Sequence, residues 1–156
     1  MIAPYFDPRR SNNFLDTCAF DPKTEPEATC AWQIRKLFEE DKIRLILSHT
    51  NQKEIDHPNT PLSVKTQATA TLFTLPVHIT PKEVNTQRAI HQILRGNSNP
   101  LAHYADATHI AEAIKYGGCF ITTDKRILLK RHSLEEIGVI VLKPSEWMKK
   151  FDGFDD

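Results

Sequence analysis

The sequence has few cysteines and no excess of charge of either sign. Its three cysteines, Cys18, Cys30 and Cys119, are an odd number with no CxxC pair, and they are too few for a disulfide scaffold. We therefore expect a reducing, cytoplasmic location. Twenty lysines and arginines balance twenty aspartates and glutamates. Because no global field draws the chain to nucleic acid or to a membrane surface, any contact with a polyanion must come from a local patch.

Long apolar runs and several well-known motifs are also missing. No stretch approaches the roughly 20 apolar residues of a membrane-spanning helix, so we expect no membrane partner. The first 13 residues contain no apolar core of the kind that signal peptides have. The chain has no Walker loop, no GxGxxG and no GxSxG motif. Neither Cys18 nor Cys119 has the His/Asn arrangement that would make it a convincing nucleophile.

The length and composition indicate one globular domain. With 156 residues, 40% of them hydrophobic, the chain is long enough to bury a core, and we predict a single domain over residues 1–156. Residues 1–13 contain prolines, arginines and asparagines and predict an irregular lead-in. We expect a frayed tail over residues 152–156.

Apolar strand candidates alternate with helical periodicity along the chain. We predict a first strand that ends near Asp16, and further strands over residues 43–47, 119–122 and 138–142. Predicted helices cover residues 27–41, 62–75, 81–95 and 101–116, with shorter helical segments around Glu54, over 125–132 and from Pro144. Residues 77–80 form a short strand or an extended link. This alternation predicts a three-layer α/β/α domain with a mainly parallel central sheet.

Four acidic residues lie where a parallel α/β domain usually places its site, beyond the carboxyl ends of the strands. Asp16 follows the first predicted strand, and Glu54 comes seven residues after Leu47, the last apolar residue of the second. Asp106 opens a helix, and Asp124 follows a strand. Taken singly, each of these acids has an ordinary interpretation as a turn residue, a helix cap or a solvated side chain.

Taken together, the four acids predict a metal site. Clustered carboxylates repel one another and raise each other's pKa values, so a protein keeps such a cluster chiefly when a cation neutralises it. Oxygen ligands without thiolate or paired imidazole favour Mg²⁺ or Mn²⁺. Such ions activate water and stabilise charge in an in-line phosphoryl displacement, so the pattern predicts hydrolysis of phosphodiesters.

Several segments together resemble the PIN-domain ribonucleases. They are LDTCAF, a Ser48-x5-Glu54 pair, ADATHIAEAIKYGG, FITTDKRI and GVIVLKPSEW, and they span residues 14–147. The chain is most similar to the VapC-like toxin subunits of bacterial and archaeal toxin–antitoxin pairs. The most specific block contains Asp106 and Asp124. They are 18 residues apart, and the Gly117-Gly118 pair that ends the predicted helix lies between them. Two features depart from the family pattern: the strand before Asp16 is polar, and Cys18 stands where the family often has Asn or Ser.

The resemblance implies a fold, an activity and partners. It implies a sheet flanked by helices and endonucleolytic cleavage of RNA with Mg²⁺ or Mn²⁺. The four family acids fall on Asp16, Glu54, Asp106 and Asp124, all expected to act as catalytic metal ligands, with Glu54 as ligand or base. Thr122 matches the family's supporting threonine, which we expect to hydrogen-bond near Asp124. The family also implies an antitoxin protein and a homodimer as partners.

A basic run follows the last acid and has two interpretations. It consists of Lys125, Arg126, Lys130 and Arg131. The usual interpretation of such a run is a solvated helix face. The alternative is an RNA-binding rim that contacts phosphates beside the metal site and positions RNA without recognising its sequence.

Other groupings of the same residues remain open. His103, Asp106 and His109 lie at i, i+3 and i+6, which suggests a softer metal site, although i and i+6 lie about 120° apart on a helix. We expect one of the two histidines to lie near the four acids at the carboxyl ends of the strands. Asp56 could replace Glu54, but on a helix the two point roughly 200° apart, which favours Glu54. The sequence is also compatible with two other functions. One is a catalytically inactive PIN-like module that binds RNA or protein, and the other is a hydrolase of small phosphate esters.

Overall fold

The computed structural model of the chain describes residues 6–47, 72–73, 80–96, 104–116 and 118–153. One five-stranded sheet lies at its centre, with the strand order β3-β2-β1-β4-β5. All of its strand pairs are parallel. The strands are β1 (Asn12–Leu15), β2 (Arg44–Leu47), β3 (Leu72–Phe73), β4 (Gly118–Ile121) and β5 (Ile140–Leu142).

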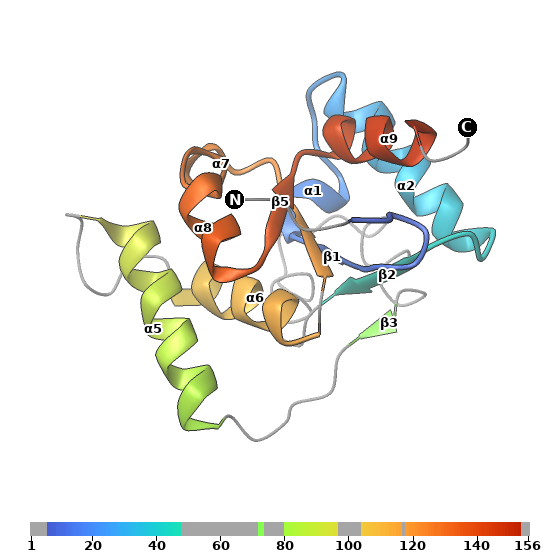
Figure 1. The fold of residues 1–156 in the computed structure, drawn as a ribbon. Coiled ribbons are helices and arrows are strands. Elements are labelled where there is room, and N and C mark those ends of the chain that lie inside the picture. Colours follow the sequence, from blue (N-terminus) through green and yellow to red (C-terminus); the bar gives the residue numbers. More distant parts are fainter. Residues whose placement is uncertain (1–5, 48–71, 74–79, 97–103, 117, 154–156) are drawn as a thin grey trace.

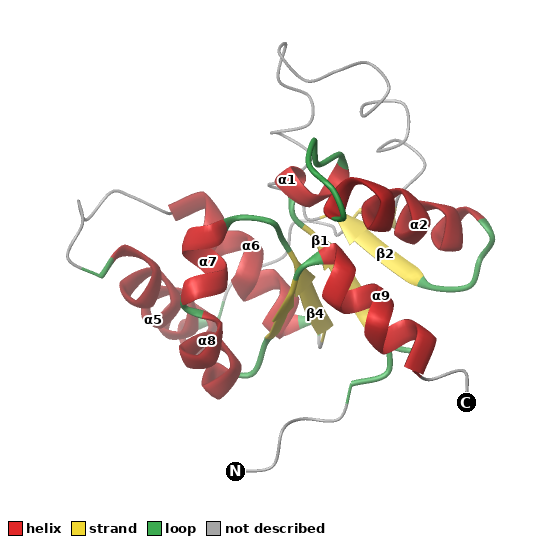
Figure 2. Cartoon of the chain, turned by 90° about the horizontal axis from the view of Figure 1, so that it is seen from above, coloured by secondary structure: helices red, strands yellow, loops and turns green. Residues whose placement is uncertain are grey.

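Helices cover both faces of this sheet (Figures 1 and 2). One layer contains α1 (Thr17–Phe20), α2 (Glu27–Glu39) and α9 (Pro144–Gly153). The opposite layer contains α5 (Pro81–Arg95), α6 (Tyr104–Lys115), α7 (Lys125–Leu129) and α8 (Arg131–Ile137). The predicted three-layer α/β/α architecture with a parallel sheet is therefore confirmed. Among the described residues, no helix is long and apolar enough to cross a membrane.

Each central strand contributes to two separate cores, because successive side chains of a strand point to opposite faces of the sheet. In β1, Phe14 packs under α5 and α6, whereas Leu15 packs under α2 and α9. In β4, Phe120 joins the first of these cores and Ile121 joins the second. All four side chains are at most 1% exposed. This arrangement explains why the C-terminal halves of β1 and β4 are apolar on both faces, as expected for the inner strands of a parallel sheet.

Within the described residues most predicted elements are present; the differences are shifted ends and one strand, β3, where a helix was predicted. The helices predicted over 27–41 and 81–95 correspond to α2 and α5, and Thr80 caps α5 by accepting a hydrogen bond from the backbone N–H of Glu83. The predicted lead-in over 1–13 was wrong at its end, because Asn12 and Asn13 already pair in β1. The predicted helix over 62–75 was wrong at Leu72–Phe73, which pairs with β2 as a strand. The predicted tail over 152–156 begins too early, because Asp152 and Gly153 complete α9.

The polar start of β1 is explained by hydrogen bonds. Asn13 is completely buried, and its Nδ2 donates to the carbonyls of Arg44 at 2.8 Å and Pro8 at 3.0 Å. Its Oδ1 accepts from Nε1 of the buried Trp147 at 2.9 Å. The side chain thus links β1 to β2, to the lead-in and to α9. Buried polar groups are tolerated when their hydrogen bonds are satisfied, so Asn13 stabilises a specific arrangement around β1.

Replacing Trp147 by Phe tests this link. The variant leaves the Asn13 amide oxygen buried without the indole donor and removes ring volume from the core. We expect the free energy of unfolding to fall by about 2–4 kcal/mol, measured by urea denaturation. The control is Trp32→Phe, because Trp32 is 51% exposed, and there we expect less than about 1 kcal/mol. Equal losses in the two variants would contradict the proposed role of the Asn13–Trp147 hydrogen bond.

Candidate metal site

The candidate site lies where the strand order changes direction. From β1 the chain continues to β2 and β3 on one side of the sheet and then returns to β4 and β5 on the other. In parallel α/β sheets, ligands bind beyond the carboxyl ends of the strands at such a switch point. Asp16 comes directly after β1 at this edge, and its backbone N–H donates to the carbonyl of Ile121 in β4 at 2.9 Å. Asp16 is therefore fixed between the two central strands.

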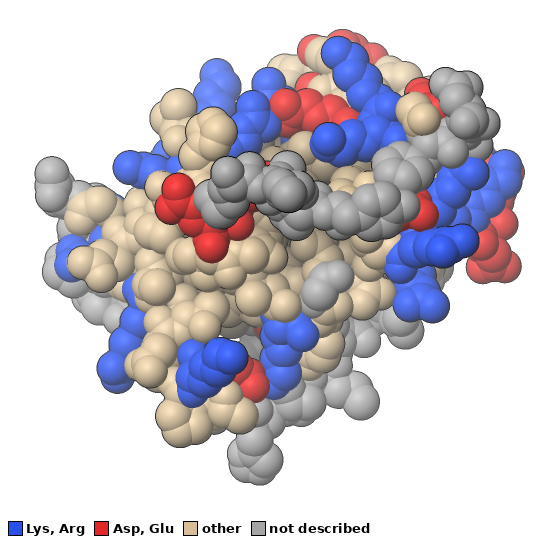
Figure 3. All heavy atoms as spheres, viewed as in Figure 1, with Lys and Arg blue, Asp and Glu red and all other residues tan. Residues whose placement is uncertain are grey.

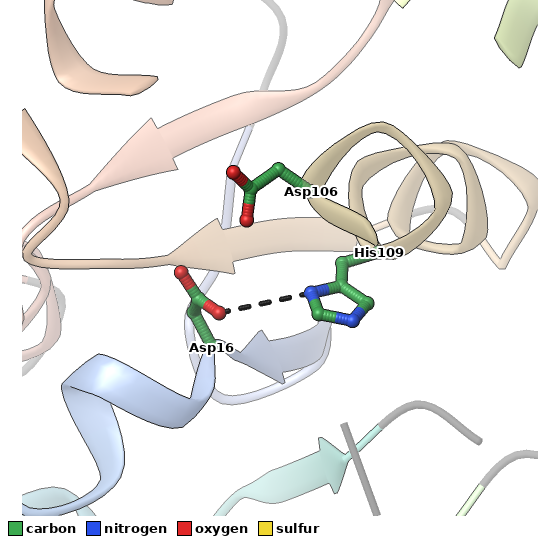
Figure 4. A group of neighbouring side chains, drawn as sticks. All are labelled: Asp16, Asp106 and His109. Atoms are coloured by element: carbon green, nitrogen blue, oxygen red, sulfur yellow. Dashed lines mark ion pairs between the residues drawn. The ribbon is translucent and has the colours of Figure 1, made fainter. Parts of the chain in front are cut away.

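Helix α6 supplies two further side chains to the same edge. This helix leads into the start of β4 and packs along it, so its own first turn lies near the strand ends. Asp106 is in that first turn, and His109 follows at i+3 on the same helix face. One potential ligand atom from each of Asp16, Asp106 and His109 lies within 4.8 Å of the other two. Figure 4 shows the three side chains converging from β1 and α6.

The two oxygens of Asp16 have different surroundings. Oδ2 accepts a hydrogen bond from the Thr122 hydroxyl at 2.8 Å and from the Cys18 thiol at 3.3 Å. Oδ1 faces Nδ1 of His109 at 3.7 Å. Asp16 is only 5% exposed, and Thr122 and His109 are at most 1% exposed. The two donors therefore fix the plane of the carboxylate and direct Oδ1 toward α6.

The ionisation of Asp16 and Cys18 follows from these contacts. Burial by itself would raise the pKa of Asp16, but the neighbouring His109 and the hydrogen bonds from Thr122 and Cys18 outweigh it, and the pKa lies below its ordinary value. Burial and the charge of Asp16 raise the pKa of the Cys18 thiol to about 11. At neutral pH the carboxylate is therefore ionised and the thiol is protonated. Cys18 acts as a hydrogen-bond donor to Asp16 rather than as a thiolate.

Asp124 is connected to the site but has a different local role. Its side chain caps α7 by accepting a hydrogen bond from the backbone N–H of Arg126 at 2.9 Å. Its own backbone N–H donates to the Thr122 hydroxyl at 3.1 Å, as the sequence predicted for Thr122. One hydroxyl group therefore joins Asp124 to Asp16. Among the described residues, Asp124 is not a member of the group whose ligand atoms lie within 4.8 Å.

The structure covers the other predicted site residues only in part. Glu54, with its alternative Asp56, and His103 lie outside the described residues. The sequence did not predict which histidine would join the site. The spacing of His109 from Asp106 indicated a common helix face, and either His103 or His109 was expected near the four acids. The sequence contained no signal that the ring of His109 would lie against Asp16, because that contact depends on how α6 packs on β1.

The predicted RNA-binding residues lie on α7 and at the start of α8. Lys125, Arg126 and Lys130 are exposed, and Arg126 also pairs with Asp124 at 3.5 Å. Arg131 instead donates from Nη1 to both carboxylate oxygens of Glu146, at 2.8 and 3.0 Å. On the face shown in Figure 3, lysine and arginine side chains are scattered among acidic and uncharged surface. The basic run is thus largely available at the surface, apart from Arg131.

Neither a protein-family model nor a curated protein matches the sequence.

Replacing Thr122 by Val tests how the buried carboxylate is held. Val has nearly the same shape as Thr but removes the donor to Asp16 and the acceptor for Asp124. We expect the free energy of unfolding to fall by about 1–3 kcal/mol in urea denaturation, because a buried charge loses a hydrogen bond. The control is Thr123→Val, which removes only an exposed hydrogen bond to the Cys18 carbonyl and should cost less than about 1 kcal/mol. A Thr122→Val variant as stable as wild type would rule out this anchoring role.

Glu146→Gln tests the contact that engages Arg131. Burial raises the pKa of Glu146, but the Lys143 backbone N–H and the Arg131 guanidinium outweigh it, and the pKa lies below its usual value of 4.5. The charged contact therefore stabilises the fold above pH 4.5, and this stabilisation is lost as the pH falls through the folded-state pKa. Because the side chains are 33–40% exposed, we expect only about 1 kcal/mol at pH 7.

The measurement is urea unfolding of wild type and Glu146→Gln at pH 7 and pH 3. The difference between wild type and variant should be smaller at pH 3 than at pH 7, because the stabilisation by the Glu146 charge is lost as the pH falls through the folded-state pKa. Glu136→Gln, at an exposed position in α8, is the control and should show little difference at either pH. A difference that stays constant with pH would show that the Glu146 charge contributes nothing.

Proposed function

We propose that the protein is a metal-dependent endoribonuclease of the PIN type, which hydrolyses RNA phosphodiester bonds. One observation carries the proposal: Asp16 and Asp106, far apart in sequence, come together with His109 at the switch point of a parallel sheet. The four-acid motif pattern predicted that Asp16 and Asp106 would share a site. The resemblance to PIN-domain ribonucleases supplies the reaction and the substrate class.

The donor set fits a divalent cation. Asp16 is buried and ionised beside a second carboxylate, and like charges at that separation disfavour each other unless a cation lies between them. The available atoms are carboxylate oxygens and an imidazole nitrogen, which suit Mn²⁺ and, through the oxygens, Mg²⁺. A divalent ion held there would stabilise charge on a phosphoryl oxygen and lower the pKa of a bound water.

The protein's own residues have distinct roles in this proposal. Asp16 and Asp106 hold the cation, and Thr122 and Cys18 keep the Asp16 carboxylate in one orientation through its Oδ2. Glu54 is proposed as a further ligand or base, as the family resemblance implies. Asp124 is proposed to complete the acidic set, with the Thr122 hydroxyl joining its backbone to Asp16.

RNA is proposed to approach along the basic residues that follow Asp124. Lys125, Arg126 and Lys130 are exposed on α7 and its C-terminal end. Their charges would contact phosphates and position the strand without recognising its sequence. Arg131 is proposed to contribute less than these three, because it already pairs with Glu146. An antitoxin protein and a second copy of the chain are proposed partners that rest on the family resemblance alone.

The test is cleavage of RNA by purified protein with Mn²⁺, on single-stranded and structured substrates. Asp16→Asn and Asp106→Asn should each reduce the rate more than about 100-fold, which corresponds to about 2.7 kcal/mol of lost transition-state stabilisation. Asp152→Asn is the matched control, because it makes the same chemical change at an exposed position in α9 and should leave the rate unchanged.

The outcomes separate this proposal from its alternatives. Equal cleavage by wild type and Asp106→Asn would assign the activity to another site or to a contaminant. Intact RNA bound by protein that takes up no Mn²⁺ would favour a catalytically inactive PIN-like binding module. Hydrolysis of small phosphate esters with RNA left intact would favour a different phosphohydrolase.

A further inference from the structure

We infer that His109 is a third ligand of the metal site, which makes the site a mixed carboxylate–imidazole centre. Such a centre would take a first-row transition ion, such as Mn²⁺ or Co²⁺, in preference to Mg²⁺. The inference rests on the proposed function in that it requires a divalent cation at Asp16 and Asp106. It goes further because it names a nitrogen ligand and the class of ion.

The spacing between His109 and Asp16 suits two ligands of one ion. Nδ1 of His109 lies 3.7 Å from Oδ1 of Asp16, which is too long for a direct hydrogen bond. Ligand atoms at about 2.1 Å from a common ion are about 3.0 Å apart at a right angle and about 4.2 Å apart when opposite. The observed distance falls between these values. All three ligand atoms, including one from Asp106, lie within 4.8 Å of one another.

Burial holds the imidazole in this position. His109 is 1% exposed, and its helix neighbours Ala107, Ile110 and Ala113 are completely buried. Because α6 is packed against β1 and β4, the ring is enclosed by the core and is directed at Asp16 (Figure 4). A ligand that is already oriented loses little conformational entropy when the ion binds. The fold therefore presents a nitrogen donor at the place where the carboxylates converge.

The chemistry of the donors determines the preferred ion. Mg²⁺ favours oxygen ligands and water, whereas imidazole nitrogen favours first-row transition ions. Among the described residues, Cys18 has the only thiol beside the site. This thiol donates a hydrogen bond to Oδ2 of Asp16, whereas His109 faces the other oxygen, Oδ1. The site therefore offers oxygen and nitrogen donors without a thiolate. This donor set distinguishes the centre from one made of carboxylates alone.

The experiment detects nitrogen coordination directly. Wild-type protein is loaded with Mn²⁺ and studied by pulsed EPR, where a coordinated histidine gives ¹⁴N modulation that changes to the ¹⁵N pattern after ¹⁵N-histidine labelling. We expect this signal in wild type and its loss in His109→Gln. Mn²⁺ binding by His109→Gln, followed through the free-ion EPR signal, should weaken at least about tenfold. Mg²⁺ binding, followed by competition with Mn²⁺, should weaken less.

Two further variants serve as controls. His91→Gln changes the other buried histidine of the described residues, which lies on α5 and outside the three-residue group, and it should keep the nitrogen signal. His103→Gln tests whether the signal comes from the other histidine near Asp106 in sequence. A signal lost in His103→Gln but retained in His109→Gln would overturn the inference. If His109→Gln does not fold, as judged by circular dichroism, labelled wild type and His103→Gln still decide.

The result also separates this inference from the proposed function. Mn²⁺ bound through Asp16 and Asp106 without nitrogen modulation would overturn the inference and leave the proposed nuclease intact. In that case His109 would be a buried partner that orients Asp16. Wild type that binds no Mn²⁺ would overturn both the inference and the proposed metal-dependent nuclease.

Discussion

The structure depends on how it accommodates one buried charge, the carboxylate of Asp16 at the end of the central strand. Removing such a group from water costs several kcal/mol, even after local relaxation. The neighbouring His109 and the hydrogen bonds from the Thr122 hydroxyl and the Cys18 thiol offset this cost, and a good hydrogen bond to a charged group contributes about 1.5–3 kcal/mol. Together they hold the pKa of Asp16 below its ordinary value, so the carboxylate is ionised. The fold therefore maintains a charge beside a second carboxylate, an arrangement that a cation would stabilise.

The same strand explains why its first residues are polar. Asn13 lies three residues before Asp16 and uses its amide group to connect β2, the lead-in and Trp147 of α9. Phe14 and Leu15, between them, fill the cores on the two faces of the sheet. β1 thus combines specific polar contacts with apolar packing on both sides. The polar residues before Asp16 are part of the framework that fixes the backbone leading into it.

Much of this fold could be predicted from local pattern. Helical periodicity, with Pro81 at the first helical position and Glu83 in the first turn, located α5, and apolar runs located β2, β4 and β5. The ends of elements were less predictable, because pairing partners override local preference, as Asn12 in β1 and Leu72 in β3 illustrate. In the site, the spacing of the acids indicated Asp16 and Asp106. It could not indicate that His109 would face Asp16, because that contact depends on packing between elements.

The cation site formed by Asp16, Asp106 and their neighbours can be tested most directly by a crystal structure of the protein with Mn²⁺, with an anomalous difference map recorded at the manganese absorption edge. We expect a peak between Asp16 and Asp106, within bonding distance of both carboxylates and on the Oδ1 side of Asp16. A fully soaked crystal with no peak there, or with manganese bound only elsewhere on the molecule, would contradict it.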